Sequence, residues 1–330
     1  MPDAVTATKL RALSGVQPSG QLHLGNWAGA IRQFVELQDT HDVYIFIASY
    51  HAMTSVTDPA ELRTHVRQVA IDYLAFGLDP AKAVLYRQQD VPEVTELAWM
   101  LGCACPVSQM QKAVAYKDKV AKGLSPNIGL FTYPILQAAD ILAVDPDVVP
   151  VGQDQKQNVE ITRDLAQRFN HVYGEVFKLP EPRFRAHAAV LPGLDGEKMS
   201  KSLNNGIDPF MPEKQLRKTV MRIVSDSTPM EAPKDPEKDT TFQVYRALLS
   251  DDDPRTAALA ERYRAGNFGY GHAKQALFEL ILDVFGEARS RREELMADPG
   301  EVERVLADGA TRAREVVSAV TDRARAAVGL

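Results

Sequence analysis

The sequence predicts an α/β protein in which a doubly wound parallel sheet, covered by helices, is followed by an α-helical domain. Short β-branched runs alternate with segments of helical periodicity in the first half of the chain, as in a parallel sheet with crossover helices. The run Val43-Tyr44-Ile45-Phe46-Ile47 is apolar on both faces, which a strand needs when helices cover both sides of its sheet. From about residue 208 the strand patterns give way to helical ones.

The elements of the first half carry recognisable start and stop residues. Two more strands are expected at Ala83–Tyr86 and Val148–Val151. A helix is expected after Asp58, because this residue can cap the helix, a proline follows it and an acid stands three residues on. Apolar residues then recur at helical spacing until Gly77. Another helix is expected over residues 155–173, before a glycine.

The second half reads as four helices, at about residues 212–224, 256–264, 272–287 and 300–328. The stretch 225–241 is rich in Asp, Pro and Lys, which predicts a long exposed connection.

Composition excludes several classes of protein. A chain of 330 residues with 45% hydrophobic and 25% charged residues is globular rather than disordered or fibrous. No apolar run approaches the roughly 18 residues of a membrane helix, and the first eight residues lack the pattern of a secretory signal. Cys103 and Cys105 make neither a disulfide framework nor a four-ligand zinc site, and we expect them to be buried thiols of a cytoplasmic protein. The net charge of −6 argues against nucleic-acid binding through bulk positive charge.

A first candidate nucleotide-binding segment spans residues 14–27, where glycines and a proline precede a helix. Backbone N–H groups at a helix start attract phosphate, and Gln17, Ser19, His23 and Asn26 can add neutral donors. A plain junction between strand, turn and helix explains the segment equally well. The dinucleotide fingerprint G-x-G-x-x-G is absent from it.

Two further segments are also candidates for nucleotide binding. Asp154 follows a strand and a glycine, at the edge of a parallel sheet where ligands bind and where an acid can accept ribose hydroxyls. An ordinary helix cap is the alternative. Lys198 and Lys201 lie on one loop, where two ammonium groups suit a leaving group that gains charge. A basic surface loop is the alternative.

The motifs together resemble a known family. Lys198-Met199-Ser200-Lys201-Ser202 matches the KMSKS signature of class I aminoacyl-tRNA synthetases, and His23-Leu24-Gly25-Asn26 resembles their HIGH signature with Asn in place of the final His. The motif order is also that of the family. The residues around the first motif and Val149–Gln157 resemble the bacterial tryptophanyl branch, and the similarity runs from about Ala12 to the last helix.

This resemblance implies a Rossmann-like catalytic domain over residues 9–207, with a helical insertion at about 99–135 that helps form a homodimer. It implies an anticodon-binding helical domain over residues 208–330, whose last helix packs back on the catalytic domain. The expected reaction is activation of L-tryptophan by ATP, with loss of pyrophosphate, and transfer to the 3′ adenosine of tRNA(Trp). Magnesium would be carried by ATP, with no metal ligand from protein side chains, and no membrane partner is expected.

The resemblance also implies roles for particular residues. The lysines Lys198 and Lys201 would neutralise pyrophosphate, and Lys119 would assist them. The ATP site would further contain Gln17, Pro18, Ser19, Gly25, Asn26, Gly152, Gln153, Asp154, Val190, Met199, Ser200 and Ser202.

The resemblance places tryptophan recognition on the helix after Pro134. Tyr133, Gln137 and Asp140 share one face of that helix, and a carboxylate in apolar surroundings suits an indole N–H, which only donates. Without the resemblance, Asp140 would be paired to a distant Arg or would cap a loop. The other residues expected to contact tryptophan are Gln155, His51 and Gln17.

The sequence also allows other functions. Gln137 resembles the tyrosyl branch, where an amide can donate to a phenolic oxygen, so a tyrosine–tRNA ligase is one alternative. A synthetase-like regulatory protein that binds ATP or RNA is another, and a nucleotidyltransferase that makes a dinucleotide cofactor is a third. The arginines of the last two helices alternate with acids, so an anticodon-binding surface and a solvated helix surface fit them about equally.

Overall fold

The fold is taken from a computed structural model of the chain, which describes residues 9–18, 20, 22–121, 127–152, 155–183 and 191–330. In helix α7 (Val114–Ala121) the side chains of residues 114, 115, 118 and 119 are outside this description.

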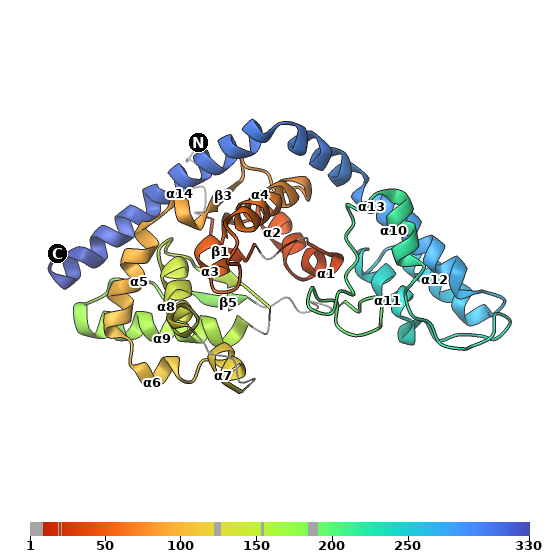
Figure 1. Ribbon diagram of the computed structural model, residues 1–330, viewed down its shortest axis with the longest axis horizontal. Helices are drawn as coiled ribbons and strands as arrows, with labels where there is room; N and C mark the ends of the chain where they lie inside the picture. The colour runs from red at the N-terminus through yellow and green to blue at the C-terminus, as the bar shows by residue number, and fades with distance from the viewer. Residues whose placement is uncertain (1–8, 19, 21, 122–126, 153–154, 184–190) are drawn as a thin grey trace, which may run out of the picture.

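A five-stranded parallel sheet organises the first half of the chain (Figure 1). Its strands are β1 (Arg11–Val16), β2 (Asp42–Ile47), β3 (Ala83–Arg87), β4 (Val148–Pro150) and β5 (Glu181–Arg183), in the order β3-β2-β1-β4-β5. The three strands expected from the sequence are confirmed, and β1 and β5 are additional. The strand order reverses between β1 and β4, and such a reversal opens a crevice at the carboxyl ends of the two strands.

Both faces of the sheet are covered. Val43, Ile45 and Ile47 of β2 belong to one buried apolar cluster, while Tyr44 and Phe46 of the same strand belong to another. Alternate residues of a strand point to opposite faces, so the uninterrupted apolar run follows from burial on both sides.

Two of the expected helices have the expected ends. In α4 (Pro59–Ala75) the Asp58 carboxylate accepts hydrogen bonds from the backbone N–H groups of Ala60 and Glu61, at 2.7 and 3.2 Å. Helix α9 (Lys156–Tyr173) ends at Gly174, whose φ of 91° is a conformation that side-chain-bearing residues rarely adopt.

The connection from β3 to β4 is mostly helical. It comprises α5 (Glu93–Ala104), α6 (Val107–Met110), α7 and α8 (Ile128–Leu142). The expectation of a helix after Pro134 is wrong at its start, because α8 begins at Ile128 and contains Pro134. The Asn127 side chain caps α8 by accepting from the N–H of Leu130 at 2.8 Å. Between β1 and β2, α1 (Leu24–Asn26), a π-helical turn (Trp27–Ile31) and α2 (Arg32–Leu37) form one continuous segment, and the short α3 (Ser49–Ala52) follows β2.

The second half is helical. Its elements are α10 (Glu213–Val220), α11 (Thr240–Ala247), α12 (Pro254–Ala265), α13 (Tyr270–Ala297) and α14 (Pro299–Val328). All four expected helices are present, and α11 is additional. The connection expected to be exposed is in part buried, since Lys234 and Asp239 are 6% and 7% exposed. Lys234 donates to three carbonyl groups of this connection, and Asp239 caps α11.

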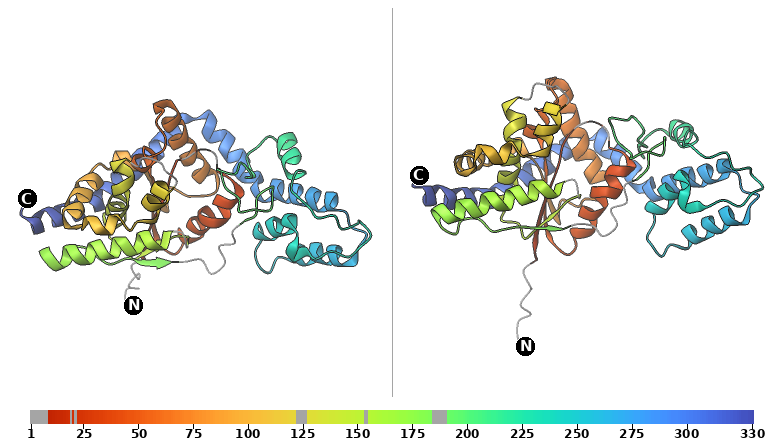
Figure 2. Two further views of the ribbon diagram at one scale, coloured as in Figure 1. Left: turned by 60° about the horizontal axis from the view of Figure 1, so that its bottom comes forward. Right: turned by 90° about the horizontal axis from the view of Figure 1, so that it is seen from below.

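The last helix lies against the edge of the sheet. Figure 1 shows α14 running along the α/β region, with α10–α12 at the end away from the C-terminus, and both views of Figure 2 agree. A Cβ atom added to Gly309 would stand 1.9 Å from the carbonyl oxygen of Leu85 in β3, so the helix backbone touches the strand backbone. Helix α14 therefore covers an edge strand that would otherwise be open to pairing.

The expectation of buried cysteines is wrong for Cys103, which is exposed; Cys105 is partly buried. Helix α5 buries Leu97 and Leu101, so Trp99 and Cys103 face outward, and Trp99 is 76% exposed. Among the described residues, no helix is long and apolar enough to cross a membrane.

Candidate active site

A cavity of about 740 Å³ lies at the reversal of strand order. Gly15 and Gln17 at the end of β1, Ala48 after β2, and Gly152 after β4 contribute to its lining. The position follows from the topology, because the carboxyl ends of strands that diverge at a reversal leave a space that no crossover helix fills. The other walls come from the segment 23–34, from α8, from the start of α9 and from the loop at 191–199.

The turn that opens the first helix is held by a reciprocal cap. The backbone N–H of Asn26 donates to Nδ1 of His23 at 3.3 Å, and the N–H of His23 donates to Oδ1 of Asn26 at 3.1 Å. Burial, with the nearby positive charge of Lys201 as a smaller cause, lowers the pKa of His23 to about 4. His23 is therefore neutral near pH 7 and can act as an acceptor. The Asn that replaces the final His of the HIGH pattern completes this cap.

The KMSKS loop packs directly on this turn, although the two motifs are far apart in the sequence. The N–H of Gly25 points at Sδ of Met199, with 3.3 Å between N and S, and the N–H of Leu24 donates to the carbonyl of Ile207 at 2.9 Å. A Cβ atom on Gly25 would lie 3.0 Å from His23 Nδ1 and 3.4 Å from Met199 Cβ, so a larger residue at position 25 would press on the His23 ring.

The backbone N–H groups of the turn are therefore already engaged in this structure. The sequence led us to expect these groups at the helix start to be open to a phosphate, and in the observed conformation this is wrong for Leu24, Gly25 and Asn26. Withdrawal of Met199 would release the N–H of Gly25.

The two signature lysines have different surroundings. Lys198 lines the cavity. Lys201 is not among the lining residues, and its Nζ donates to the carbonyl of Gly20 at 2.9 Å. Burial lowers the pKa of Lys201, and the carboxylate of Asp72 opposes this effect.

Amides and a phenol form the polar wall made by α8 and α9. Gln155 Oε1 accepts from Nδ2 of Asn158 at 2.9 Å and from Nε2 of Gln137 at 3.5 Å. Burial raises the pKa of the Tyr133 hydroxyl, and a hydrogen bond with Asn158 opposes the shift. All four side chains line the cavity.

Asp140 lies one layer behind this wall. It is 2% exposed and does not line the cavity, whereas His51, whose Nε2 is 2.9 Å from Asp140 Oδ2, does. Nε2 of Gln88 lies 2.8 Å from both Asp140 oxygens. Burial raises the pKa of Asp140, and the hydrogen bonds from His51 and Gln88 counteract it.

Neither alternative for Asp140 is found in the described residues, where its side chain bonds a histidine and a glutamine rather than an arginine or a loop backbone. Gln88 was not among the residues expected from the sequence. Its place directly after β3, at the carboxyl edge of the sheet, is the signal that could have indicated it.

Eleven of the expected site residues can be placed against the cavity. It is lined by Gln17, Gly25, Asn26, His51, Tyr133, Gln137, Gly152, Gln155, Lys198 and Met199, and Asp140 stands behind it. Pro18, Ser200, Lys201 and Ser202 are described but do not line it. Ser19, Gln153, Asp154, Val190 and the side chain of Lys119 lie outside the described residues.

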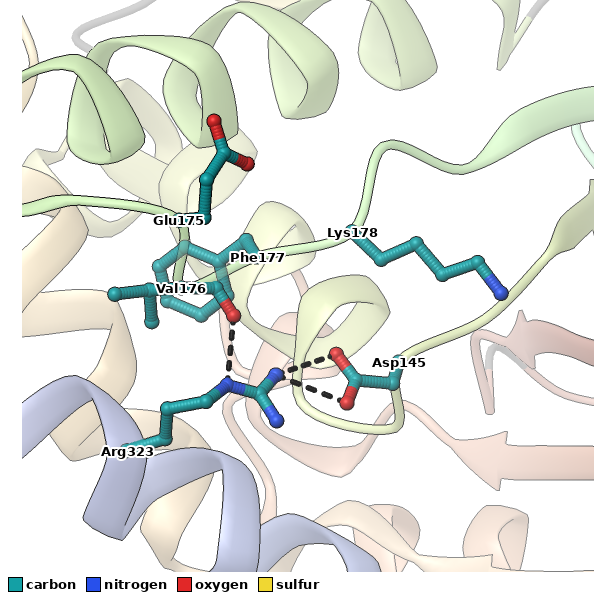
Figure 3. Close-up of a pocket in the computed structure, with 6 residues that line it drawn as sticks. All are labelled: Asp145, Glu175, Val176, Phe177, Lys178 and Arg323. Atoms are coloured by element: carbon teal, nitrogen blue, oxygen red, sulfur yellow. Dashed lines mark hydrogen bonds and ion pairs between the residues drawn. The ribbon is translucent and has the colours of Figure 1, made fainter.

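A second hollow, of about 460 Å³, lies on the surface between α14 and two loops, the one that precedes β4 and the one that follows α9 (Figure 3). Arg323 crosses it, with Nη2 at 2.7 and 2.9 Å from the oxygens of Asp145 and Nε donating to the carbonyl of Val176 at 2.7 Å. Lys178 is paired with Asp147. These charges are satisfied within the chain, so the hollow is a structural contact of α14.

A parallel sheet with a cavity at its strand reversal, walled in part by a histidine-capped turn and a KMSKS loop, is the architecture of a class I aminoacyl-tRNA synthetase. The model of the family described as tRNA synthetases class I (W and Y) matches residues 6–286, and the chain belongs to this family.

Relatives and solved structures agree with this assignment. The chain is 50% identical over 321 residues to the tryptophan–tRNA ligase of Rhodopirellula baltica, covering 97% of this chain and 100% of the relative. The tryptophanyl-tRNA synthetase of Campylobacter jejuni, solved with ADP and tryptophan, has 45% identity and a TM-score of 0.91, covering 97% of this chain and all of that one. The enzyme from Mycoplasma pneumoniae has 29% identity and a TM-score of 0.82, covering 98% of both chains.

Proposed function

We propose that this protein is a tryptophan–tRNA ligase. The tryptophan carboxylate attacks the α-phosphorus of ATP, a P–O bond forms, and the bond to the bridging oxygen breaks to release pyrophosphate. A hydroxyl of the terminal adenosine of tRNA(Trp) then attacks the carbonyl carbon of the adenylate, and AMP leaves. Such a reaction needs placement and charge stabilisation rather than a covalent enzyme intermediate.

The observation that carries the proposal is the meeting of the two signature motifs at the strand reversal. The Met199 contact with Gly25 brings the lysine-bearing loop against the histidine-capped turn, beside the cavity. A mere ATP- or RNA-binding regulator has no need of positive charge for a leaving pyrophosphate, so this arrangement favours an enzyme.

ATP is placed at the end of the cavity formed by β1, β4 and the loop. Gly25, Asn26, Gly152 and Lys198 are among the residues that line the cavity, and we assign them to ATP. Lys201 would join Lys198 at the pyrophosphate by leaving the carbonyl of Gly20, and Met199 would withdraw from Gly25 in the same motion. Magnesium would be bound by the triphosphate oxygens.

Tryptophan is placed at the end formed by α8 and His51. Tyr133 and the amide of Gln155 supply polar groups for the ammonium and carboxylate of the amino acid. Asp140 is the proposed acceptor for the indole N–H, which would have to reach past the cavity wall beside His51, because Asp140 does not itself line the cavity. A carboxylate offers about four acceptor positions, and the bonds from Gln88 and His51 occupy three of them, which leaves one on Oδ1.

The choice between tryptophan and tyrosine depends in part on Gln137. Its Nε2 is 3.5 Å from Gln155 Oε1, a weak contact that leaves the amide near the cavity. Relatives with 42–50% identity over 97% of this chain are tryptophan–tRNA ligases, which supports tryptophan. A site built for the phenol of tyrosine would reject an amino acid without it by about 10⁴–10⁵, an order known for tyrosyl-tRNA synthetase.

The domain division at about residue 208, the anticodon-binding role of the helical domain and the homodimer also remain proposals. The outward face of the insertion supports a dimer, since Trp99 and Val107 are 76% and 64% exposed. In α14, Arg314, Arg323 and Arg325 are bonded to acids of the α/β region, so these three hold the helix in place. Contacts with the anticodon are therefore not assigned to them.

Amino-acid-dependent exchange of labelled pyrophosphate into ATP tests the proposal. We expect exchange with tryptophan and none with tyrosine, followed by charging of tRNA(Trp). Exchange with tyrosine but not with tryptophan would contradict the proposal and identify the protein as a tyrosine–tRNA ligase. Binding of ATP without any exchange would favour the regulatory alternative.

A further inference from the structure

Asn205 is a buried amide directly behind the KMSKS loop, and it is 3% exposed. Its Oδ1 accepts from the N–H of Ser200 at 2.8 Å. Its Nδ2 donates to Oδ1 of Asp195 at 2.7 Å and to the carbonyl of Lys198 at 3.1 Å. Both hydrogens of the amide and its oxygen are therefore used, and these three partners, Ser200, Asp195 and Lys198, all belong to the loop.

The loop is shaped around this side chain. A Cβ atom added to Gly193 would stand 2.4 Å from Cγ of Asn205, so only glycine fits there. The carbonyl of Asn205 also accepts from the N–H of Leu194 at 2.9 Å. The turn that precedes the signature is thus fixed to Asn205 by backbone and side chain alike.

The two backbone groups that Asn205 binds flank Met199. Fixing the carbonyl of Lys198 and the N–H of Ser200 leaves the peptide units on either side of Met199 little freedom to rotate. The direction of the Lys198 side chain, which lines the cavity, and the contact of Met199 with Gly25 both depend on these units.

We propose that Asn205 is a positioning residue for the activation step: it holds the Lys198–Ser200 backbone so that the ammonium group of Lys198 faces the ATP end of the cavity. The inference rests on the proposed function. Because the partners of the Asn205 amide in the described part of the chain all belong to the loop, the amide would move with it as one unit whenever the loop shifts over ATP.

Holding the Lys198 carbonyl and the Ser200 N–H at once requires a donor and an acceptor on one rigid side-chain group. An amide supplies both, whereas a carboxylate of the same shape only accepts. At this position a carboxylate would face the carboxylate of Asp195 and the carbonyl of Lys198, and it would keep only the bond from Ser200. Misplacement of a catalytic group by about 1 Å can cost on the order of 10²-fold in rate.

The test is the variant Asn205→Asp, compared with Asn204→Asp as a matched control. Asn204 is the preceding residue, is exposed, and carries the same change of charge. We expect Asn205→Asp to lower kcat of pyrophosphate exchange at least tenfold and to raise KM for ATP. Direct binding of tryptophan without ATP should stay within twofold of the unmodified protein, and Asn204→Asp should behave as the unmodified protein does.

A second change guards against simple unfolding. When Asp195→Asn is added to Asn205→Asp, the amide at position 195 can donate to the carboxylate at position 205, which reverses the original bond. We expect this double variant to recover part of the lost rate of pyrophosphate exchange and to keep the melting temperature of the unmodified protein. Normal exchange kinetics in Asn205→Asp would overturn the inference. So would an equal loss of tryptophan binding and exchange that Asp195→Asn does not restore. Absence of exchange in the unmodified protein would instead overturn the proposed function.

Discussion

Gly309 offers the most quantitative test of how α14 is joined to the sheet. In the middle of an ordinary helix, replacing glycine by alanine stabilises by about 1 kcal/mol. At Gly309 the new Cβ would stand 1.9 Å from the Leu85 carbonyl oxygen and 2.7 Å from its carbon, so helix and strand would have to separate by about 1 Å. Overpacking of this kind costs roughly 1–3 kcal/mol, and the upper end applies because backbone cannot rotate aside.

We therefore expect Gly309→Ala to lower the free energy of unfolding by about 2 kcal/mol, the overpacking cost less the gain in helix propensity. Urea denaturation followed by circular dichroism measures this change. The control is Gly286→Ala in α13, where no heavy atom lies within 4 Å of the added Cβ and a gain of up to about 1 kcal/mol is expected. Equal stabilisation by both substitutions would refute the backbone contact between α14 and β3.

Three further predictions concern the site. The pKa of His23 falls from 6.5 to about 4 on folding, so the contribution of neutral His23 to stability is complete above about pH 6.5 and is lost as the pH falls through 4. Relative to His23→Asn, the unmodified protein should lose at most about 1.4 kcal/mol of unfolding free energy per pH unit in that interval. Parallel curves of stability against pH for the two proteins would contradict this. Lys201→Ala should lower the rate of activation far more than the affinity for tryptophan, since the charge it meets develops as pyrophosphate leaves; equal losses in stopped-flow and equilibrium binding experiments would contradict the assigned role. Asp140→Asn should weaken tryptophan binding, measured by calorimetry, with little change in KM for ATP; unchanged affinity combined with a lower melting temperature would make Asp140 a purely structural residue.

The sequence predicted most of the fold because its signals are local. Alternating apolar runs, the Asp58 cap and the Gly174 stop depend on residues within one or two turns of each other, and all three are confirmed. Pro134 predicted a helix start, because proline is favoured in the first turn and disfavoured in a helix interior. It lies instead inside α8, whose start is set by the Asn127 cap.

Features that depend on contacts across the fold could not be predicted. The position of Gln88 after β3 indicates the edge of the sheet but not its bond to Asp140, and Asn205 acquires its role from a loop that closes around it. The KMSKS and HIGH-like motifs were found as patterns, but the occupation of the Gly25 N–H by Met199 emerges only in three dimensions. The outward position of Cys103 is likewise a matter of which face of α5 meets its neighbours.

A crystal structure with a non-hydrolysable tryptophanyl-adenylate analogue tests the central claim most directly. The account predicts the analogue in the cavity at the strand reversal, with the indole beside His51 and Asp140, the phosphate at the His23–Asn26 turn, and Lys198 of the loop directed toward it. An analogue bound elsewhere, or bound while Lys198 and Lys201 both point into solvent, would contradict the account.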